Sequence, residues 1–218
     1  MNTVFAPGCA LLIYKPELAE KIFNLLRKHF EVTGMYKTCC HHKPKFEEET
    51  RIISLCPGCI RRYGSLYDGV SAVSLFEMFL NIPGFQFPDH SGLRMTVLDA
   101  CPTRKDEKLH TSVRTVLSHM NIEITEPEAT GVNGKCCGDS YYGSLPKERV
   151  LEKMTRRASE MPEEDVAVYC VSCVKSMKNG GKTPRYIPDL IFNEETSPGE
   201  SDPDVWHSQI NGFIDSHR

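Results

Sequence analysis

Cysteine is the residue type in this sequence whose number and spacing most plainly suggest chemistry. The chain carries 10 cysteines among 218 residues, and they fall into two groups of five with one shared order. Each group reads as a single cysteine, an adjacent pair, and then a C-x-x-C motif. The first quintet is Cys9, Cys39, Cys40, Cys56 and Cys59, and the second quintet is Cys101, Cys136, Cys137, Cys170 and Cys173. Because unrelated thiols would hardly repeat such an order, the sequence predicts a duplicated unit.

Three kinds of site use several thiols. Disulfides are disfavoured because adjacent cysteines rarely bridge without strain. A zinc ion takes four ligands in a tetrahedron, which two C-x-x-C motifs could supply, but six cysteines would remain unexplained. An iron–sulfur cluster suits soft thiolates, and several irons can use five of them. The residues alone leave zinc and an iron–sulfur cluster as alternatives.

The start of the chain bears on the compartment. It lacks a basic region, and Pro7-Gly8 interrupts the first apolar stretch before a signal-peptide core could form. No run approaches the roughly 18 apolar residues of a membrane span. We therefore expect a cytoplasmic protein without a membrane span, in which thiols stay reduced. The net charge of −3 gives no electrostatic reason to expect a nucleic-acid partner.

The segments around the cysteines indicate the elements that must position them. Short β-prone runs precede both single cysteines and both C-x-x-C motifs, at 3–6, 95–98, 51–55 and 166–169. Apolar residues at helical spacing predict helices at 16–30 and 108–120. Strands that alternate with helices predict an α/β architecture, in which ligand-binding residues gather at the carboxyl ends of parallel strands. The cysteines should meet there.

The repeat also predicts the domain organisation. We expect a first unit at 1–88, a second unit at 89–193, and an irregular tail at 194–218 that is rich in Ser, Pro, Glu and Asp. The two units would be related by a pseudo-two-fold internal repeat. The first unit has the shorter loop, since only 15 residues separate Cys40 from Cys56.

The spacing in the second quintet is specific. Cys101 is followed after 34 residues by Cys136-Cys137-Gly138, and 32 further residues separate Cys137 from the motif Cys170-Val171-Ser172-Cys173. This pattern resembles the cysteine-rich CCG domain found in the B-type subunit of heterodisulfide reductase and in related iron–sulfur oxidoreductases. Tandem CCG units are that family's arrangement, so the resemblance covers roughly residues 3–193.

The resemblance implies cofactors and their ligands. In this family the cysteines bind noncubane 4Fe-4S clusters, so the second quintet would hold one cluster through all five of its thiols. The first quintet would hold a second 4Fe-4S cluster, but His41 replaces the glycine after the cysteine pair, and the loop is short. His41 and His42 make zinc or a different iron cluster the alternative at the first quintet.

The resemblance also implies an activity. The chain would be an enzyme, a cytoplasmic oxidoreductase that reduces a disulfide or a thiol-derived small molecule at its clusters. Tyr141, Tyr142 and Lys135 are candidates for catalytic roles beside the second quintet. Gly138 would let backbone approach a cluster closely. Two other hypotheses remain: an electron-transfer or accessory subunit of a dehydrogenase complex, and a zinc-stabilised binding module.

The chain has no Gly-rich dinucleotide fingerprint and no ferredoxin-type motif. It therefore has no evident way to collect electrons from a nicotinamide or flavin by itself. We expect a partner that delivers electrons, either an iron–sulfur subunit or a flavoprotein subunit.

Overall fold

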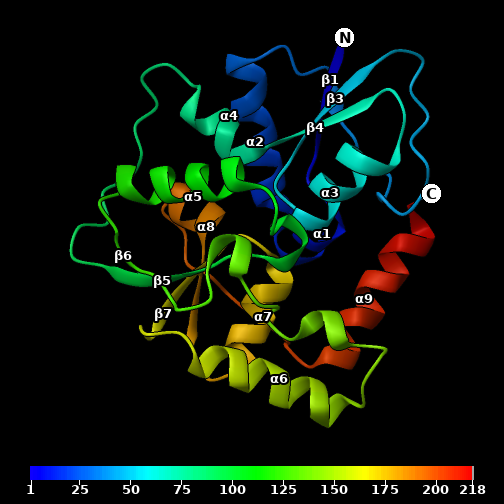
Figure 1. Ribbon diagram of the computed structural model, residues 1–218. Helices are drawn as coiled ribbons and strands as arrows, with labels where there is room; N and C mark the ends of the chain where they lie inside the picture. The colour runs from blue at the N-terminus through cyan, green and yellow to red at the C-terminus, as the bar shows by residue number, and fades with distance from the viewer. Residues whose placement is uncertain (218) are drawn as a thin grey trace. The chain divides into compact units, whose positions relative to one another are not determined.

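The computed structural model describes residues 1–217 and divides the chain into two compact units, each built on a parallel four-stranded sheet (Figure 1). Unit 1 comprises residues 1–84 together with the segment from Ser208 onward, and unit 2 comprises Phe85–His207. The sheets have the same topology, with strand orders β2-β1-β3-β4 and β6-β5-β7-β8. The expected α/β class and the internal repeat are both confirmed.

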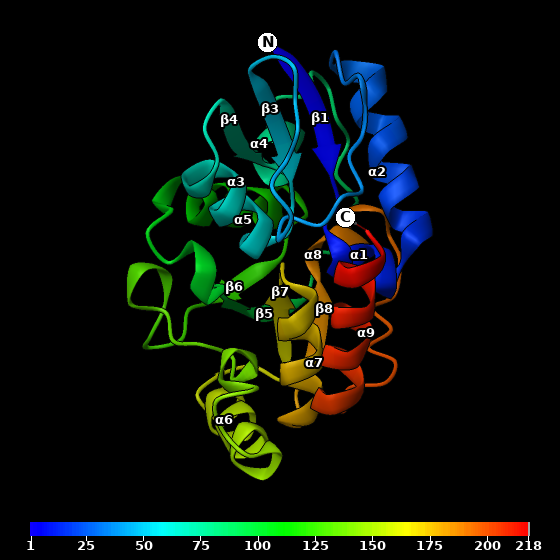
Figure 2. The ribbon, with the colours of Figure 1, turned by 90° about the vertical axis from the view of Figure 1, so that its right-hand side faces the viewer.

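Unit 1 is a compact βα arrangement in which β1 and β3 are the central strands (Figure 2). Its elements are β1 (Asn2–Ala6), α1 (Cys9–Tyr14), α2 (Pro16–His29), β2 (Gly34–Met35), β3 (Thr50–Ser54), α3 (Pro57–Leu66), β4 (Val70–Ser74) and α4 (Leu75–Leu80). All strand pairs are parallel, with Val4 opposite both Gly34 and Ile52. The expected strands at 3–6 and 51–55 correspond to β1 and β3.

Unit 2 repeats this order with one additional long helix, α6, between β6 and β7. Its elements are β5 (Arg94–Leu98), α5 (Glu107–His119), β6 (Glu123–Thr125), α6 (Lys147–Ser159), β7 (Asp165–Val168), α7 (Val171–Asn179), β8 (Thr183–Tyr186) and α8 (Ile187–Ile191), with 3-10 turns at Cys101–Thr103, Gly131–Asn133 and Asp139–Tyr141. The strand pairs are again all parallel. β5 and β7 correspond to the expected strands at 95–98 and 166–169.

Local sequence explains the two helices that were expected. In α2 a proline occupies the first turn, and Leu18, Ile22 and Leu26 are fully buried at a spacing of four residues. In α5 the carboxylate of Asp106 accepts a hydrogen bond from the Leu109 N–H at 3.0 Å, which caps the helix. Both helices therefore present one apolar face to a sheet and begin at a recognisable signal.

The tail differs from the expectation. Residues 194–202 are irregular as predicted, but Pro203–Ser216 form a helix, α9. The helix begins at a proline, and the Asp202 carboxylate accepts the N–H of Asp204 at 2.9 Å at its start. Trp206 is 1% exposed and fixes the first turn. Residues 194–207 belong to unit 2 and residues from 208 to unit 1, so the tail is part of both units.

Among residues 1–217, no helix is long and apolar enough to cross a membrane.

Candidate functional site

Each quintet lies on the loops and first helical turns that follow three neighbouring parallel strands. In unit 1 the pair Cys39-Cys40 follows β2, Cys9 follows β1, and Cys56 and Cys59 follow β3. In unit 2 the corresponding cysteines follow β6, β5 and β7. Because the carboxyl ends of parallel strands share one edge, each sheet brings its five thiols together. The expected convergence of the cysteines is therefore seen in both halves.

The thiols of each quintet form a continuous chain of contacts. In unit 1, side-chain hydrogen bonds join the five sulfurs in the order Cys9, Cys39, Cys40, Cys59, Cys56. In unit 2 the order is Cys101, Cys136, Cys137, Cys173, Cys170. The two orders are equivalent position by position. The duplicated order of cysteines in the sequence thus produces the same order of sulfur contacts twice.

In each quintet, hydrogen bonds favour the thiolate form of the first cysteine of the adjacent pair. Hydrogen bonds from the thiols of Cys40 and Cys9 lower the pKa of Cys39 to about 2. In unit 2, hydrogen bonds from Cys101 and Cys137 lower the pKa of Cys136, and the same contacts raise the pKa of Cys101 and Cys137. Each quintet therefore stabilises negative charge on the first cysteine of its adjacent pair, because both neighbouring thiols donate to it.

Polar groups of unit 2 add hydrogen bonds to the second quintet. The Gly138 N–H donates to the Cys136 sulfur at 3.3 Å, and the Ser140 hydroxyl lies 2.8 Å from the same sulfur. The Ser176 hydroxyl donates to the Cys137 sulfur at 3.3 Å and is buried. Neither serine was expected from the sequence. The position of Ser176, one helical turn after Cys173, was the available signal.

Gly138 also has a packing role that the sequence did not indicate. Its φ is +114°, and a Cβ there would lie 2.6 Å from Met154 Cγ on α6. The glycine therefore lets α6 pack against the cysteine-pair loop. In unit 1, His41 occupies the equivalent position, and the loop between Cys40 and Cys56 contains no helix. The unit 1 loop can therefore carry a side chain at this position, because it contains no helix equivalent to α6.

Gly8 allows the closest backbone approach within the first quintet. Its φ is +82°, and a Cβ there would lie 2.9 Å from Cys56 Cβ and 3.2 Å from Cys59 Sγ. The turn before Cys9 can therefore pack directly on the C-x-x-C motif only because this residue lacks a side chain.

A buried ion pair holds the loops of the second quintet. Asp99, two residues before Cys101, accepts hydrogen bonds from both terminal nitrogens of Arg114 at 3.1 and 2.8 Å, and from the Gly131 N–H at 2.8 Å. Tyr169, next to Cys170, donates its hydroxyl to Asp99 at 3.3 Å. Burial raises the pKa of Asp99, but the bonds and charge of Arg114 outweigh it and bring the pKa below its usual value. Asp99 thus connects loops that carry different cysteines.

The three candidate catalytic side chains have partners outside the quintet. The Tyr142 hydroxyl donates to Asp204 at 3.0 Å, and the Lys135 amine lies 3.1 Å from a carboxylate oxygen of Glu160. Tyr141 is exposed, with the Lys153 amine 5.5 Å from its ring centre. The hydroxyls that contact sulfur belong instead to Ser140 and Ser176.

The start of α9 braces the second quintet within unit 2. The Trp206 indole N–H donates to the Ser172 hydroxyl, inside the C-x-x-C motif, at 3.0 Å. The His207 Nε2 lies 3.0 Å from Asp139 Oδ1, and its ring stacks on Tyr142 with centres 3.9 Å apart. These contacts could not be predicted from the sequence, because the tail carries no motif of its own.

The histidines beside the first quintet differ in their surroundings. The Nε2 of His42 lies 2.7 Å from the carbonyl oxygen of Ile214, whereas His41 is exposed. Tyr36, Thr38, His41, His42, Lys43 and Lys45 line a hollow of about 580 Å³ in this loop. A cationic hollow thus adjoins the pair Cys39-Cys40.

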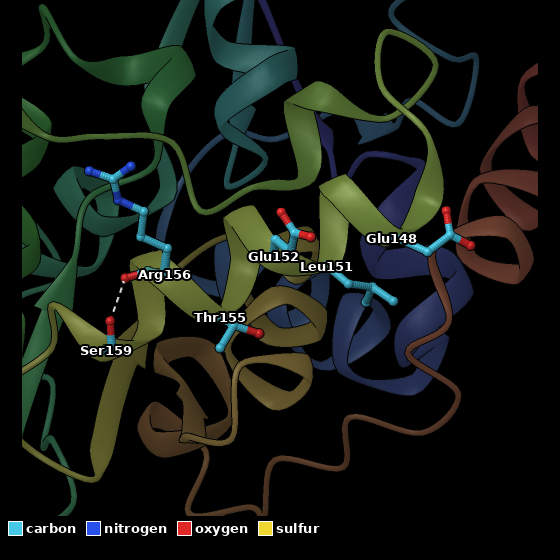
Figure 3. A pocket seen from close by; sticks show the side chains of 6 residues that line it. All are labelled: Glu148, Leu151, Glu152, Thr155, Arg156 and Ser159. Atoms are coloured by element: carbon cyan, nitrogen blue, oxygen red, sulfur yellow. Dashed lines mark hydrogen bonds between the residues drawn. The ribbon is translucent and has the colours of Figure 1, made fainter.

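A second hollow lies away from the sulfurs. It is a shallow depression on one side of α6, lined by Glu148, Leu151, Glu152, Thr155, Arg156 and Ser159 (Figure 3). No cysteine lines it, and its polar side chains come from a single helix. The cysteine quintets therefore remain the candidate site.

In the part of the chain that the structure describes, no group of three or more His, Cys, Asp or Glu is arranged as a ready site for a metal ion. No model of a known protein family matches the chain, and no curated protein resembles it significantly.

Proposed function

We propose that the chain is an iron–sulfur oxidoreductase in which each unit holds one cluster through its quintet. The observation that carries this proposal is the same chain of five thiols, formed twice at the carboxyl edges of two similar parallel sheets. A site made only of cysteine sulfurs is suited to iron or zinc. The fifth thiol favours a group with several metal ions, because a tetrahedral zinc ion takes four.

The five cysteines of unit 2 are compatible with a bound metal cluster, which we propose is a 4Fe-4S cluster of the noncubane type. Hydrogen bonds to thiolate sulfur are one way in which proteins hold and tune such clusters. The Gly138 N–H and the hydroxyls of Ser140 and Ser176 are already directed at sulfurs of the adjacent cysteine pair. In unit 1 the first quintet would hold a second 4Fe-4S cluster, with zinc as the alternative there.

When bound, such a cluster supplies single electrons and iron atoms with an affinity for sulfur. The protein contributes binding, exclusion of water and proton placement. Cys137 and Cys173 are buried, whereas Cys101, Cys136 and Cys170 are partly exposed. A substrate would therefore approach from the side of these three residues. The Ser140 hydroxyl, 2.8 Å from the Cys136 sulfur, would hold a proton at that open side.

The substrate in this proposal is a small disulfide or another thiol-derived molecule. A partner protein carrying an iron–sulfur cluster or a flavin would deliver the electrons. The cationic hollow beside Cys39 and Cys40 would favour substrates with an anionic group at the first quintet.

The test is anaerobic analysis of iron, acid-labile sulfide and zinc, combined with electron paramagnetic resonance. We expect brown protein with a noncubane 4Fe-4S signal that disappears in Cys173→Ser and persists in the control Ser159→Ala, on the outer side of α6. Reduced protein should then convert a small disulfide into two thiols. Colourless protein with stoichiometric zinc would contradict the cluster, and clusters without any disulfide turnover would contradict the proposed reaction.

A further inference from the structure

The two cysteine-pair loops are covered by different means. In unit 2 the 32 residues between Cys137 and Cys170 contain α6, which packs on the loop where Met154 meets Gly138. In unit 1 the 15 residues between Cys40 and Cys56 contain no helix. Yet Cys39 and Cys40 are only 3% and 6% exposed. Core residues of unit 1 and Phe46 of the loop pack against the apolar cluster that contains both cysteines, and so does Ile214 of the 208–217 segment.

The 208–217 segment makes the relevant contacts within unit 1. The Cys39 N–H donates to the carbonyl oxygen of His217 at 2.9 Å. The His42 ring lies at hydrogen-bonding distance, 2.7 Å, from the carbonyl oxygen of Ile214. Ile214 itself packs against the apolar cluster that contains Cys39 and Cys40. These contacts join residues more than 170 positions apart in the sequence.

The Ile214 carbonyl lies in the last turn of α9, where the carbonyl groups of a helix have no partner inside the helix, and His217 directly follows the helix. An N–H from the cysteine pair and the His42 ring supply the missing partners, as capping groups do. The rings of Phe213 and His217 stack with centres 3.7 Å apart, which fixes the final turn. The helix end is thus held in place by hydrogen bonds between groups that would otherwise lack partners.

We propose that the 208–217 segment is the cover of the first quintet, with His42 as its anchor, and that it replaces the helix which the short loop lacks. His42 is then a positioning residue. The cover acts on thiols with or without a bound metal, so the inference does not depend on the proposed function. Release of the segment should expose Cys39 and Cys40 and leave the second quintet unchanged.

The test measures thiol alkylation in the reduced, metal-free chain. Short pulses of N-ethylmaleimide, followed by mass spectrometry of peptides, give a rate for each cysteine. In a chain that stops at His207, we expect Cys39 and Cys40 to react at least about tenfold faster, because local opening is no longer required. Cys136 and Cys137 should stay within about twofold of the full chain. Both rates would be compared after circular dichroism has verified the remaining helices.

A milder variant keeps the test decisive if the shortened chain does not fold. His42→Ala removes the anchor alone, and we expect faster alkylation of Cys39 and Cys40 together with faster amide hydrogen exchange in 208–217. Gln209→Ala, an exposed position on the same helix, is the matched control and should change neither rate. Unchanged rates in His42→Ala, or equal acceleration at both quintets, would overturn the proposal whatever metal the protein binds.

Discussion

The two units build the same chain of sulfurs with different supports. In unit 2, α6, Gly138, two serine hydroxyls and the Asp99–Arg114 pair all lie in or between the loops that carry the thiols. In unit 1, His41 replaces the glycine and the distant 208–217 segment provides the cover. The comparison indicates that a shared strand order and a shared order of cysteines gather the thiols although the loop lengths differ. The support around them can differ, so the two sites should differ in robustness.

The largest expected effect separates the quintets directly. Cys137→Ser should remove the noncubane signal, because it would delete a proposed ligand that is buried in the better supported site. Cys40→Ser should leave a large part of that signal, since it affects only the first quintet. The measurement is metal content and electron paramagnetic resonance of both variants, prepared side by side without oxygen. Equal losses, or the reverse order, would show that unit 2 is not the firmer site.

Removal of the ion pair should weaken unit 2 strongly. Arg114→Ala leaves the buried Asp99 carboxylate without its main partner, which costs about 3–5 kcal/mol of folding free energy. Arg94→Ala is the matched control, because the Arg94–Glu123 pair is exposed and should contribute less than about 1 kcal/mol. Urea unfolding of the metal-free variants gives both values. A loss below about 1 kcal/mol in Arg114→Ala would mean that Asp99 does not organise these loops.

The glycine position should respond differently in the two units. Gly138→Ala places a Cβ against Met154 at a positive φ, and we expect a loss of about 2–3 kcal/mol from overpacking and backbone strain. His41→Ala, at the equivalent exposed position, should change stability by no more than about 0.5 kcal/mol. Denaturation midpoints of the two variants test this, and similar effects at both positions would refute the packing explanation.

Lowering the pH should reduce the difference in the free energy of unfolding between the native chain and Arg114→Ala. The folded-state pKa of Asp99 is lowered, so its contribution is present above the unfolded value of about 3.9 and is lost as pH falls through the folded pKa. Without Arg114, burial raises that pKa, and the variant gains relative stability as pH falls. We expect the gap to shrink by about 1–2 kcal/mol between pH 7 and pH 4. A stability difference that grows as the pH falls would contradict this prediction.

The smallest expected effect concerns one hydroxyl. In the loaded protein, Ser176→Ala removes a donor to the Cys137 sulfur, which should lower the cluster's reduction potential by up to roughly 40 mV. Ser159→Ala, whose hydroxyl donates to the Arg156 carbonyl at the far end of α6, should leave the potential unchanged. Redox titration followed by resonance spectroscopy measures the potential of each variant. Equal potentials in Ser176→Ala and the native protein would show that the Ser176 hydroxyl does not act on the cluster.

The sequence was most informative where chemistry and periodicity coincided. The strands before Cys9, Cys56, Cys101 and Cys170 could be predicted because β-prone runs end at cysteines. The edge strands were not assigned for physical reasons: β2 has only two residues, and β8 contains Pro184, which breaks a normal strand pattern. Short strands like these form because a neighbouring strand offers a partner, which local propensity does not reveal.

The contacts that support the site were harder to predict. Asp99, just after β5, and Arg114, on α5, meet only in the folded chain, and neither residue stands out in a local motif. The composition of 194–202 correctly predicted irregular chain, but it hid the start of α9 at Pro203. That helix depends on Trp206 and on its contacts with the motif loops, so its evidence lies in tertiary structure.

The position of the cover in the chain has a consequence for the order of events during synthesis. All five cysteines of the first quintet are made by residue 59, but Ser208 follows 149 residues later. At 5–20 residues per second, this interval lasts roughly 7–30 s. Throughout it the first quintet has its thiols but lacks the segment that encloses them. A nascent chain therefore exposes these sulfurs to metal donors, and equally to oxidants, before the 208–217 segment can cover them.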